Sequence, residues 1–110
     1  MDTCCRETTD QHFNDAVAGK DLQAYHRGRF NRTTRILLKA LRPRAAGVSS
    51  LLDIGGGTGV ILHEMLDGSA MAATFVEIAS AYLRVAREEA EKRGYGGRVR
   101  FMQGDFVYDL

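Results

Sequence analysis

The residues most able to do chemistry in this sequence lie together in the segment Asp53-Ile54-Gly55-Gly56-Gly57-Thr58-Gly59. Glycines are needed where a chain leaves a strand, turns sharply and brings bare backbone amides against a ligand at the start of a helix. An acidic residue followed by alternate glycines therefore predicts a binding turn of the nucleotide type.

Two better-known glycine loops do not fit this segment. The P-loop needs a lysine directly after its last glycine, and no lysine occurs between Lys39 and Lys92. The dinucleotide fingerprint G-x-G-x-x-G needs a third glycine or alanine, but the positions in question hold Val60 and Leu62. What remains is a glycine turn with an acidic residue in front of it.

Alternating strands and helices are predicted to position this turn. Short apolar runs at 51–54 and 72–76 and the alternating pattern at 99–101 predict strands, while the apolar spacing in 60–66 and 79–90 predicts helices. Such alternation implies right-handed crossovers and a parallel sheet. We therefore predict an α/β fold with a partial parallel sheet in the order 3-2-1, its first strand buried on both faces.

Two more acidic residues follow the next predicted strands. Glu77 ends the second strand, about 20 positions beyond the glycines. Asp105 follows the third strand, within Gly104-Asp105-Phe106. Because parallel strands end at one edge of a sheet, these carboxylates are expected near the glycine turn.

The first 47 residues are predicted to form about three helical pieces before the sheet. Gly19 is expected to end a first helix, and residues 21–26 are expected to form a second short turn. A third helix is expected from Asn31 as N-cap to Arg42, because Pro43 disfavours helical geometry in the residue before it. One face of this helix is predicted to carry Ile36, Leu37, Ala40 and Leu41.

Charge divides the chain into two parts. Residues 1–47 carry nine basic and five acidic side chains, whereas residues 48–110 carry six and nine. The stretch from Arg27 to Arg44, here called the basic arm, contains no acidic residue. Solvated arginines are the simpler explanation of this arm, and a clamp for an anionic substrate or an RNA backbone is the alternative.

Composition and length restrict the other possibilities. A chain of 110 residues with 45% hydrophobic and 26% charged residues is typical of one globular domain or less, and it excludes disordered and collagen-like classes. No window has the length of a membrane span, and the first residues lack a signal peptide pattern, so a soluble cytoplasmic protein without a membrane partner is expected. Adjacent Cys4 and Cys5 are expected as thiols, and they match zinc-ligand spacing poorly with His12 and His26, so no metal is expected. His63, in the predicted helix after the glycines, is expected at the surface.

Taken together, the glycine turn, Glu77 and Asp105 resemble the class I, Rossmann-like methyltransferases that use S-adenosyl-L-methionine. The resemblance covers roughly residues 48–108. It implies that S-adenosyl-L-methionine is the cofactor and that an unidentified methyl acceptor is the substrate. The cofactor-binding residues that it implies are Asp53 at the turn or on the ligand amino group, Gly55, Gly57 and Gly59 near the methionine moiety, Glu77 on both ribose hydroxyls, Asp105 on the adenine amino group, and Ile78 and Phe106 on the adenine ring. Tyr25 would reach the cofactor carboxylate.

The same resemblance implies a three-layer, Rossmann-like α/β fold with a seven-stranded sheet, of which this chain supplies the first three strands after its N-terminal helices. We therefore expect a basic helical arm over 1–47 and the first half of a cofactor-binding domain over 48–110, as a truncated chain in which no catalytic residue is assigned. Two alternatives stay open: a small basic nucleic-acid-binding module, and an NAD- or adenosine-binding protein. The second would complete its sheet by self-association along the unpaired edge of strand 1.

Overall fold

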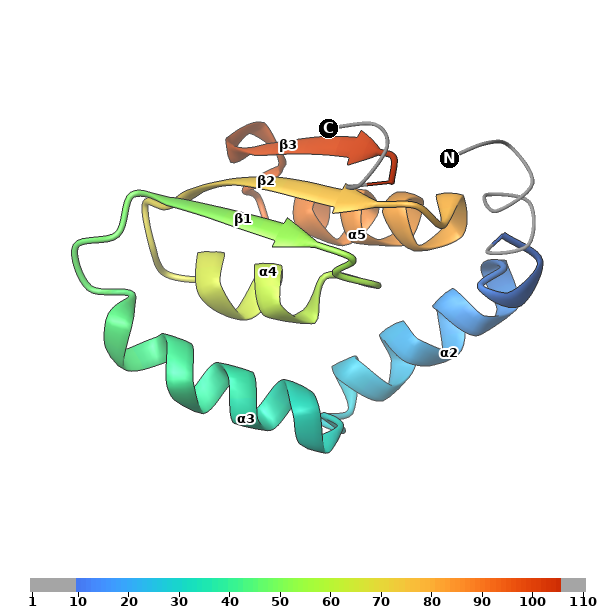
Figure 1. The fold of residues 1–110 in the computed structure, drawn as a ribbon, viewed down its shortest axis with the longest axis horizontal. Coiled ribbons are helices and arrows are strands. Elements are labelled where there is room, and N and C mark those ends of the chain that lie inside the picture. Colours follow the sequence, from blue (N-terminus) through green and yellow to red (C-terminus); the bar gives the residue numbers. More distant parts are fainter. Residues whose placement is uncertain (1–9, 106–110) are drawn as a thin grey trace.

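The computed structural model of the chain describes residues 10–105. Three parallel strands form its sheet, in the order β1-β2-β3 (Figure 1). Their bounds are β1 Ser50–Ile54, β2 Ala72–Glu77 and β3 Val99–Gln103. The predicted α/β class and the strand order 3-2-1 are confirmed.

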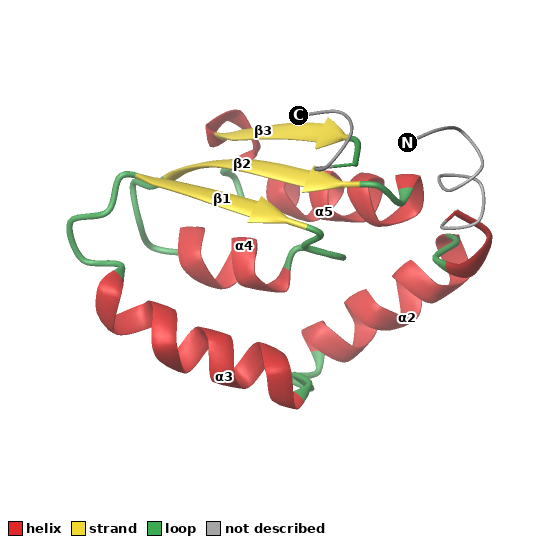
Figure 2. Cartoon of the chain, viewed as in Figure 1, coloured by secondary structure: helices red, strands yellow, loops and turns green. Residues whose placement is uncertain are grey.

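The two crossover helices cover one face of this sheet. Helix α4 (Val60–Leu66) joins β1 to β2, and α5 (Ser80–Lys92) leads through η2 (Gly96–Arg98) to β3. Both helices lie on the same side of the strands (Figure 2), because successive crossovers of one hand in one direction place their helices on one face. The hydrophobic core lies between the sheet and these helices, and Phe75, Leu62 and Leu66 are among its largest fully buried side chains.

Two further helices lie beyond this layer (Figure 1). Helix α2 (Asp15–His26) is capped by Asn14, whose side chain accepts hydrogen bonds from two first-turn amides. The expectation that Gly19 ends a helix was wrong, because α2 runs unbroken through it. A glycine inside a helix costs only about 1 kcal/mol, and α2 packs against α5 through the fully buried Ala18.

Helix α3 (Arg32–Leu41) starts at the predicted N-cap, where the Asn31 side chain accepts a hydrogen bond from the Thr34 amide at 2.8 Å. It continues into the short 3₁₀ turn η1 (Arg42–Arg44). The core-facing side of α3 carries Leu38, which is buried, whereas Ile36 is 57% exposed. The predicted apolar face therefore points largely away from the core. Leu38, which was not assigned to that face, packs in the core instead.

Strand β1 forms one edge of the sheet. Its side chains alternate, so that Leu51 and Asp53 are half-buried while Leu52 and Ile54 are exposed. The expectation that this strand is buried on both faces is not met within residues 10–105. No element of that part of the chain pairs with the free edge or covers the face opposite the helices.

Candidate functional site

The predicted site residues within 10–105 gather at the carboxyl ends of the strands. The parallel register pairs Ile54 with Val76 and Glu77 with Gln103, so the three strands end side by side. The Gly104 amide also donates to the Glu77 carbonyl at 3.2 Å, which ties the end of β3 to the end of β2. In open α/β sheets this edge is where ligands bind.

The glycine turn joins β1 to α4 with three residues in left-handed backbone conformation. The φ angles of Gly55, Gly57 and Gly59 are 69°, 62° and 88°. Residues that carry a side chain rarely adopt such φ angles, so each of the three predicted positions requires glycine. Two hydrogen bonds brace the turn, from the Gly55 amide to the Val76 carbonyl at 2.7 Å and from the Gly59 amide to the Gly56 carbonyl at 3.0 Å.

Gly56 is required for a different reason, which the motif did not reveal. A Cβ atom at this position would lie 2.4 Å from Cε2 of Phe75 and 2.7 Å from Oδ2 of Asp53. The backbone of the turn therefore packs directly on the core of the sheet. The only signal in the sequence was the unbroken run of three glycines.

The Glu77 carboxylate holds the turn to the end of β2. Its Oε1 atom accepts a hydrogen bond from the Gly57 amide at 2.9 Å, and Oε2 accepts one from the Ala79 amide at 2.9 Å. The residue is only 6% exposed. These two backbone donors satisfy part of the carboxylate's capacity of about four lone-pair sites.

Asp53 lies beside Glu77 with an unused oxygen. Its Oδ2 atom is buried and has no hydrogen-bond partner in the described part of the chain. Burial raises the pKa of Asp53 to about 6, and the nearby Glu77 carboxylate adds to the effect. A buried carboxylate oxygen without a donor is costly, so it is suited to a cationic or hydrogen-bonding ligand group.

Two cavities flank the turn. The smaller, of about 190 Å³, is lined by Ile54, Gly55, Val76, Ile78, Gly104 and Asp105. It thus brings together three of the predicted positions, Gly55, Ile78 and Asp105. Phe106, predicted to lie on the same ligand ring, is outside the described residues.

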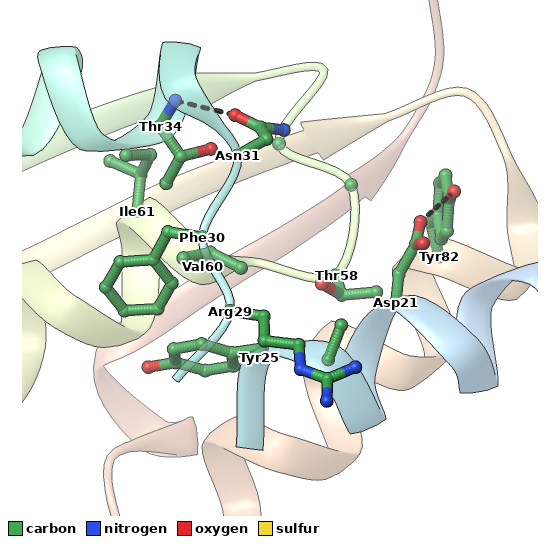
Figure 3. Close-up of a pocket in the computed structure, with 13 residues that line it drawn as sticks. Asp21, Tyr25, Arg29, Phe30, Asn31, Thr34, Thr58, Val60, Ile61 and Tyr82 are labelled. Carbon is green, nitrogen blue, oxygen red and sulfur yellow. Dashed lines mark hydrogen bonds between the residues drawn. The ribbon is translucent and has the colours of Figure 1, made fainter. Parts of the chain in front are cut away.

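The larger cavity, of about 330 Å³, lies between the turn and the two N-terminal helices (Figure 3). One wall is the turn itself with Gly57 and Thr58, and the other is formed by α2 and its connection to α3. Asp21 and Arg29 bring opposite charges to it, and the Asp21 carboxylate accepts a hydrogen bond from the Tyr82 hydroxyl at 2.5 Å. The turn was predicted from its motif and Tyr25 from the resemblance, but the wall as a whole was not, because nothing local in 21–34 marks it.

Tyr25 lines this cavity with its ring but not with a free hydroxyl. The hydroxyl donates to Oε2 of Glu64 at 2.7 Å, and the residue is buried. Burial and this hydrogen bond both raise the pKa of Tyr25. The suggestion that Tyr25 reaches a cofactor carboxylate therefore conflicts with its geometry, since its hydroxyl proton is committed to Glu64.

His63 is fully buried, and the expectation of a surface position was wrong. Its imidazole contacts the Thr58 carbonyl and the Tyr95 hydroxyl. The imidazole is covered by the Tyr25 ring from α2 and by Tyr95 from the segment after α5. A histidine among apolar neighbours gave no sequence signal of this role.

The basic arm is mostly exposed, and Arg42 forms an ion pair with Glu64 at 2.5 Å. Among residues 10–105 no group of three or more histidine, cysteine, aspartate or glutamate side chains could hold a metal ion. Cys4 and Cys5 lie outside the described residues. No helix in residues 10–105 is long and apolar enough to cross a membrane.

A glycine turn at the carboxyl end of a parallel strand, with a buried acidic residue ending the next strand, defines the class of Rossmann-like nucleotide-ligand proteins. Residues 48–108, more than half of the chain, match the methyltransferase domain family. The chain belongs to this family.

Similarity to curated proteins agrees with this assignment. The ubiquinone/menaquinone biosynthesis C-methyltransferase UbiE of Methylobacterium nodulans is 39% identical over 71 residues, covering 63% of this chain and 28% of the relative. The methyltransferase ungE' of Aspergillus campestris is 36% identical over 59 residues, covering 53% and 17%. The chain therefore spans less than a third of the length of these relatives.

Solved structures share the fold. A Methanococcus maripaludis protein assigned to the S-adenosyl-L-methionine-dependent methyltransferases matches with a TM-score of 0.69 at 18% identity, covering 89% of this chain and 44% of that one. A methyltransferase of Geobacter sulfurreducens, solved with S-adenosyl-L-homocysteine, matches with a TM-score of 0.52 at 25% identity, covering 61% and 29%. The first match includes the N-terminal helices as well as the sheet, since it covers most of the chain.

Proposed function

We propose that this chain binds S-adenosyl-L-methionine and forms the cofactor-binding part of a methyltransferase. The observation that carries the proposal is the position of the Glu77 carboxylate, 2.9 Å from the amide of Gly57 and beside the unpartnered oxygen of Asp53. When bound, the cofactor supplies an electrophilic methyl group on a sulfonium. The chain's own residues bind and orient it.

The smaller cavity suits the adenine end of this ligand. Asp105 would accept a hydrogen bond from the adenine amino group, and Ile78 would pack on the ring. Phe106 stays a prediction from the sequence for the same ring. Glu77 would accept hydrogen bonds from the ribose hydroxyls, using the carboxylate lone pairs that the two backbone amides leave available. These assignments rest on the shared location of the residues at one sheet edge.

The turn suits the methionine end. Gly55, Gly57 and Gly59 leave backbone without side chains beside the ligand, and the free Oδ2 of Asp53 offers an acceptor for its ammonium group. An ammonium group there would return the raised pKa of Asp53 toward its ordinary range, because an opposite charge favours the ionised carboxyl.

Residues 1–47 would act as a cover for this end of the site, joined to the cofactor-binding part over 48–110. The larger cavity lies between the two parts, and the Arg29 guanidinium is an exposed cation on its wall. We propose that Arg29 pairs with the carboxylate of the ligand's methionine moiety. Asp21, already bonded to Tyr82, faces the same cavity.

Methyl transfer is an in-line attack, so alignment of donor and acceptor is the main contribution asked of the protein. We assign no catalytic residue and leave the acceptor unnamed. A cytoplasmic location stays a prediction from the sequence.

The free edge of β1 supports a proposal about assembly. If two copies joined their sheets at this edge, the unpaired backbone groups of β1 would form hydrogen bonds. The exposed side chains of Leu52 and Ile54 could then be partly covered. Sedimentation equilibrium tests this: a dimer that Leu52→Lys dissociates would support it, and a monomer at all concentrations would contradict it.

Chemical-shift mapping tests the cofactor proposal. Titration of ¹⁵N-labelled chain with S-adenosyl-L-homocysteine should shift the amides of Gly57, Ile78 and Asp105 most strongly. Shifts confined to the basic arm would contradict it. Strongly salt-dependent RNA binding that survives Gly57→Ala would instead favour a nucleic-acid-binding module.

A further inference from the structure

The imidazole of His63 is the most completely buried titratable group in residues 10–105. Nε2 lies 3.0 Å from the carbonyl oxygen of Thr58, and Nδ1 lies 2.6 Å from the hydroxyl oxygen of Tyr95. The Tyr25 ring stacks on it with an interplanar angle of 13°. The side chain therefore connects the glycine turn to α2 and to the segment after α5.

These contacts fix the tautomer of the imidazole. The Thr58 carbonyl can only accept a hydrogen bond, so Nε2 must carry the proton. In a neutral ring Nδ1 is then the acceptor, and the Tyr95 hydroxyl donates to it. Burial lowers the pKa of His63 to about 4 and raises that of Tyr95, so both groups hold this arrangement at neutral pH.

The glycine turn needs such a partner. Gly57 and Gly59 flank Thr58 with φ angles that only glycine adopts readily, and glycine backbone also rotates at low cost. The peptide between Thr58 and Gly59 is held at both ends, its carbonyl by His63 and its N–H by the Gly56 carbonyl at 3.0 Å. The carbonyl oxygen is thereby directed into the interior, while Thr58 lines the larger cavity.

We propose that His63 is a positioning residue for ligand binding: it locks the Thr58–Gly59 peptide so that the turn is already in its binding conformation before the ligand arrives. A rotated peptide would turn a carbonyl oxygen toward the cavity and would have to be reversed on binding. Ordering a mobile turn on binding reduces affinity, so this lock should improve it. The inference rests on the proposed binding of S-adenosyl-L-methionine.

The test compares four single variants of the full chain. His63→Leu removes the N–H that donates to the Thr58 carbonyl, and His63→Gln restores an amide N–H as a donor to it. Tyr95→Phe removes only the hydroxyl that donates a hydrogen bond to Nδ1. Leu66→Ala is the matched control, because Leu66 is equally buried in the same helix but lies at its far end. Calorimetric titration gives the Kd for S-adenosyl-L-homocysteine, with the folded fraction taken from thermal melts.

We expect His63→Leu to raise the Kd of the folded protein about tenfold, the effect of one buried hydrogen bond. His63→Gln should recover most of this loss, and Tyr95→Phe should produce a smaller rise. Leu66→Ala should lower the Tm and leave the Kd of the folded protein unchanged. An unchanged Kd in a folded His63→Leu or Tyr95→Phe variant, or an equal rise in Leu66→Ala, would overturn the proposal.

Amide hydrogen exchange tests the role of His63 separately from the proposal that the chain binds S-adenosyl-L-methionine. If the parent chain binds no S-adenosyl-L-homocysteine, the proposed function fails. The lock is then judged by the Gly59 amide, which should exchange faster in His63→Leu and Tyr95→Phe than in Leu66→Ala. Equal exchange in all variants would show that His63 only fills the core.

Discussion

The amide of Gly57 donates a hydrogen bond to Oε1 of Glu77 at 2.9 Å, so the turn after β1 is held by the residue that ends β2. The two residues are 20 positions apart in sequence. A motif on one strand and an acidic residue on the next thus form a single structural unit.

Replacing the Glu77 carboxylate should weaken ligand binding. Glu77→Gln keeps the size of the side chain but removes its charge and one acceptor, so one of the two backbone donors or a ribose hydroxyl loses its partner. We expect the Kd for S-adenosyl-L-homocysteine to rise about 10- to 100-fold. Glu88→Gln, on the exposed side of α5, is the control and should leave the calorimetric Kd unchanged.

Gly56 should be the glycine least tolerant of a side chain for packing reasons. In Gly56→Ala the added Cβ would meet Phe75 and Asp53 at less than van der Waals distance, and we expect a loss of about 1–3 kcal/mol in the free energy of unfolding. Gly19→Ala is the opposite case, because its Cβ meets nothing within 4 Å in the middle of α2. It should stabilise by about 0.5–1 kcal/mol. Chemical denaturation measures both, and equal effects would contradict this reading of the turn.

Asp53 should make stability depend on pH in a defined direction. Its pKa in the folded protein, about 6, is above the value near 3.9 of an unfolded chain. The folded state therefore binds the proton more tightly, so this group's contribution is most favourable below about pH 4 and is lost as the pH rises through about 6.

Thermal melts of the parent and Asp53→Asn measure this contribution. The Tm of the variant relative to the parent should increase between about pH 4 and about pH 7.5. A difference that is constant over this range would mean that Asp53 has an ordinary pKa.

Arg29 should distinguish ligands by their carboxylate. Arg29→Gln is expected to weaken the binding of S-adenosyl-L-homocysteine about two- to fivefold, as for an exposed ion pair at one wall of a cavity. Binding of 5′-methylthioadenosine, which lacks the amino-acid group, should not change. Arg27→Gln, in the same basic arm but outside the cavity lining, is the matched control. Equal losses for both ligands would assign Arg29 a structural role.

The sheet and its motif were predictable because their signals are local. Apolar runs interrupted by glycine predict β1, α4 and β2, and Asn31 marks the start of α3 through its own hydrogen bond to Thr34. The positions of Glu77 and Gly57 follow from parallel pairing, since strand ends in such a sheet meet at one edge.

Other features depend on contacts between distant segments. The rotation of α3 is set by Leu38 against α4, so the exposure of Ile36 could not be inferred from the helix alone. The burial of His63 depends on Tyr25 and Tyr95, which lie 38 positions before and 32 after it. The wall of the larger cavity likewise forms only when α2 and α3 pack beside the turn.

Calorimetric titration of the chain with S-adenosyl-L-homocysteine and, separately, with NAD tests whether the glycine turn and Glu77 form a site for S-adenosyl-L-methionine. We expect saturable binding of S-adenosyl-L-homocysteine with one site per chain, weakened by Glu77→Gln, and much weaker binding of NAD. Preference for NAD, or S-adenosyl-L-homocysteine binding that Glu77→Gln leaves unchanged, would contradict it.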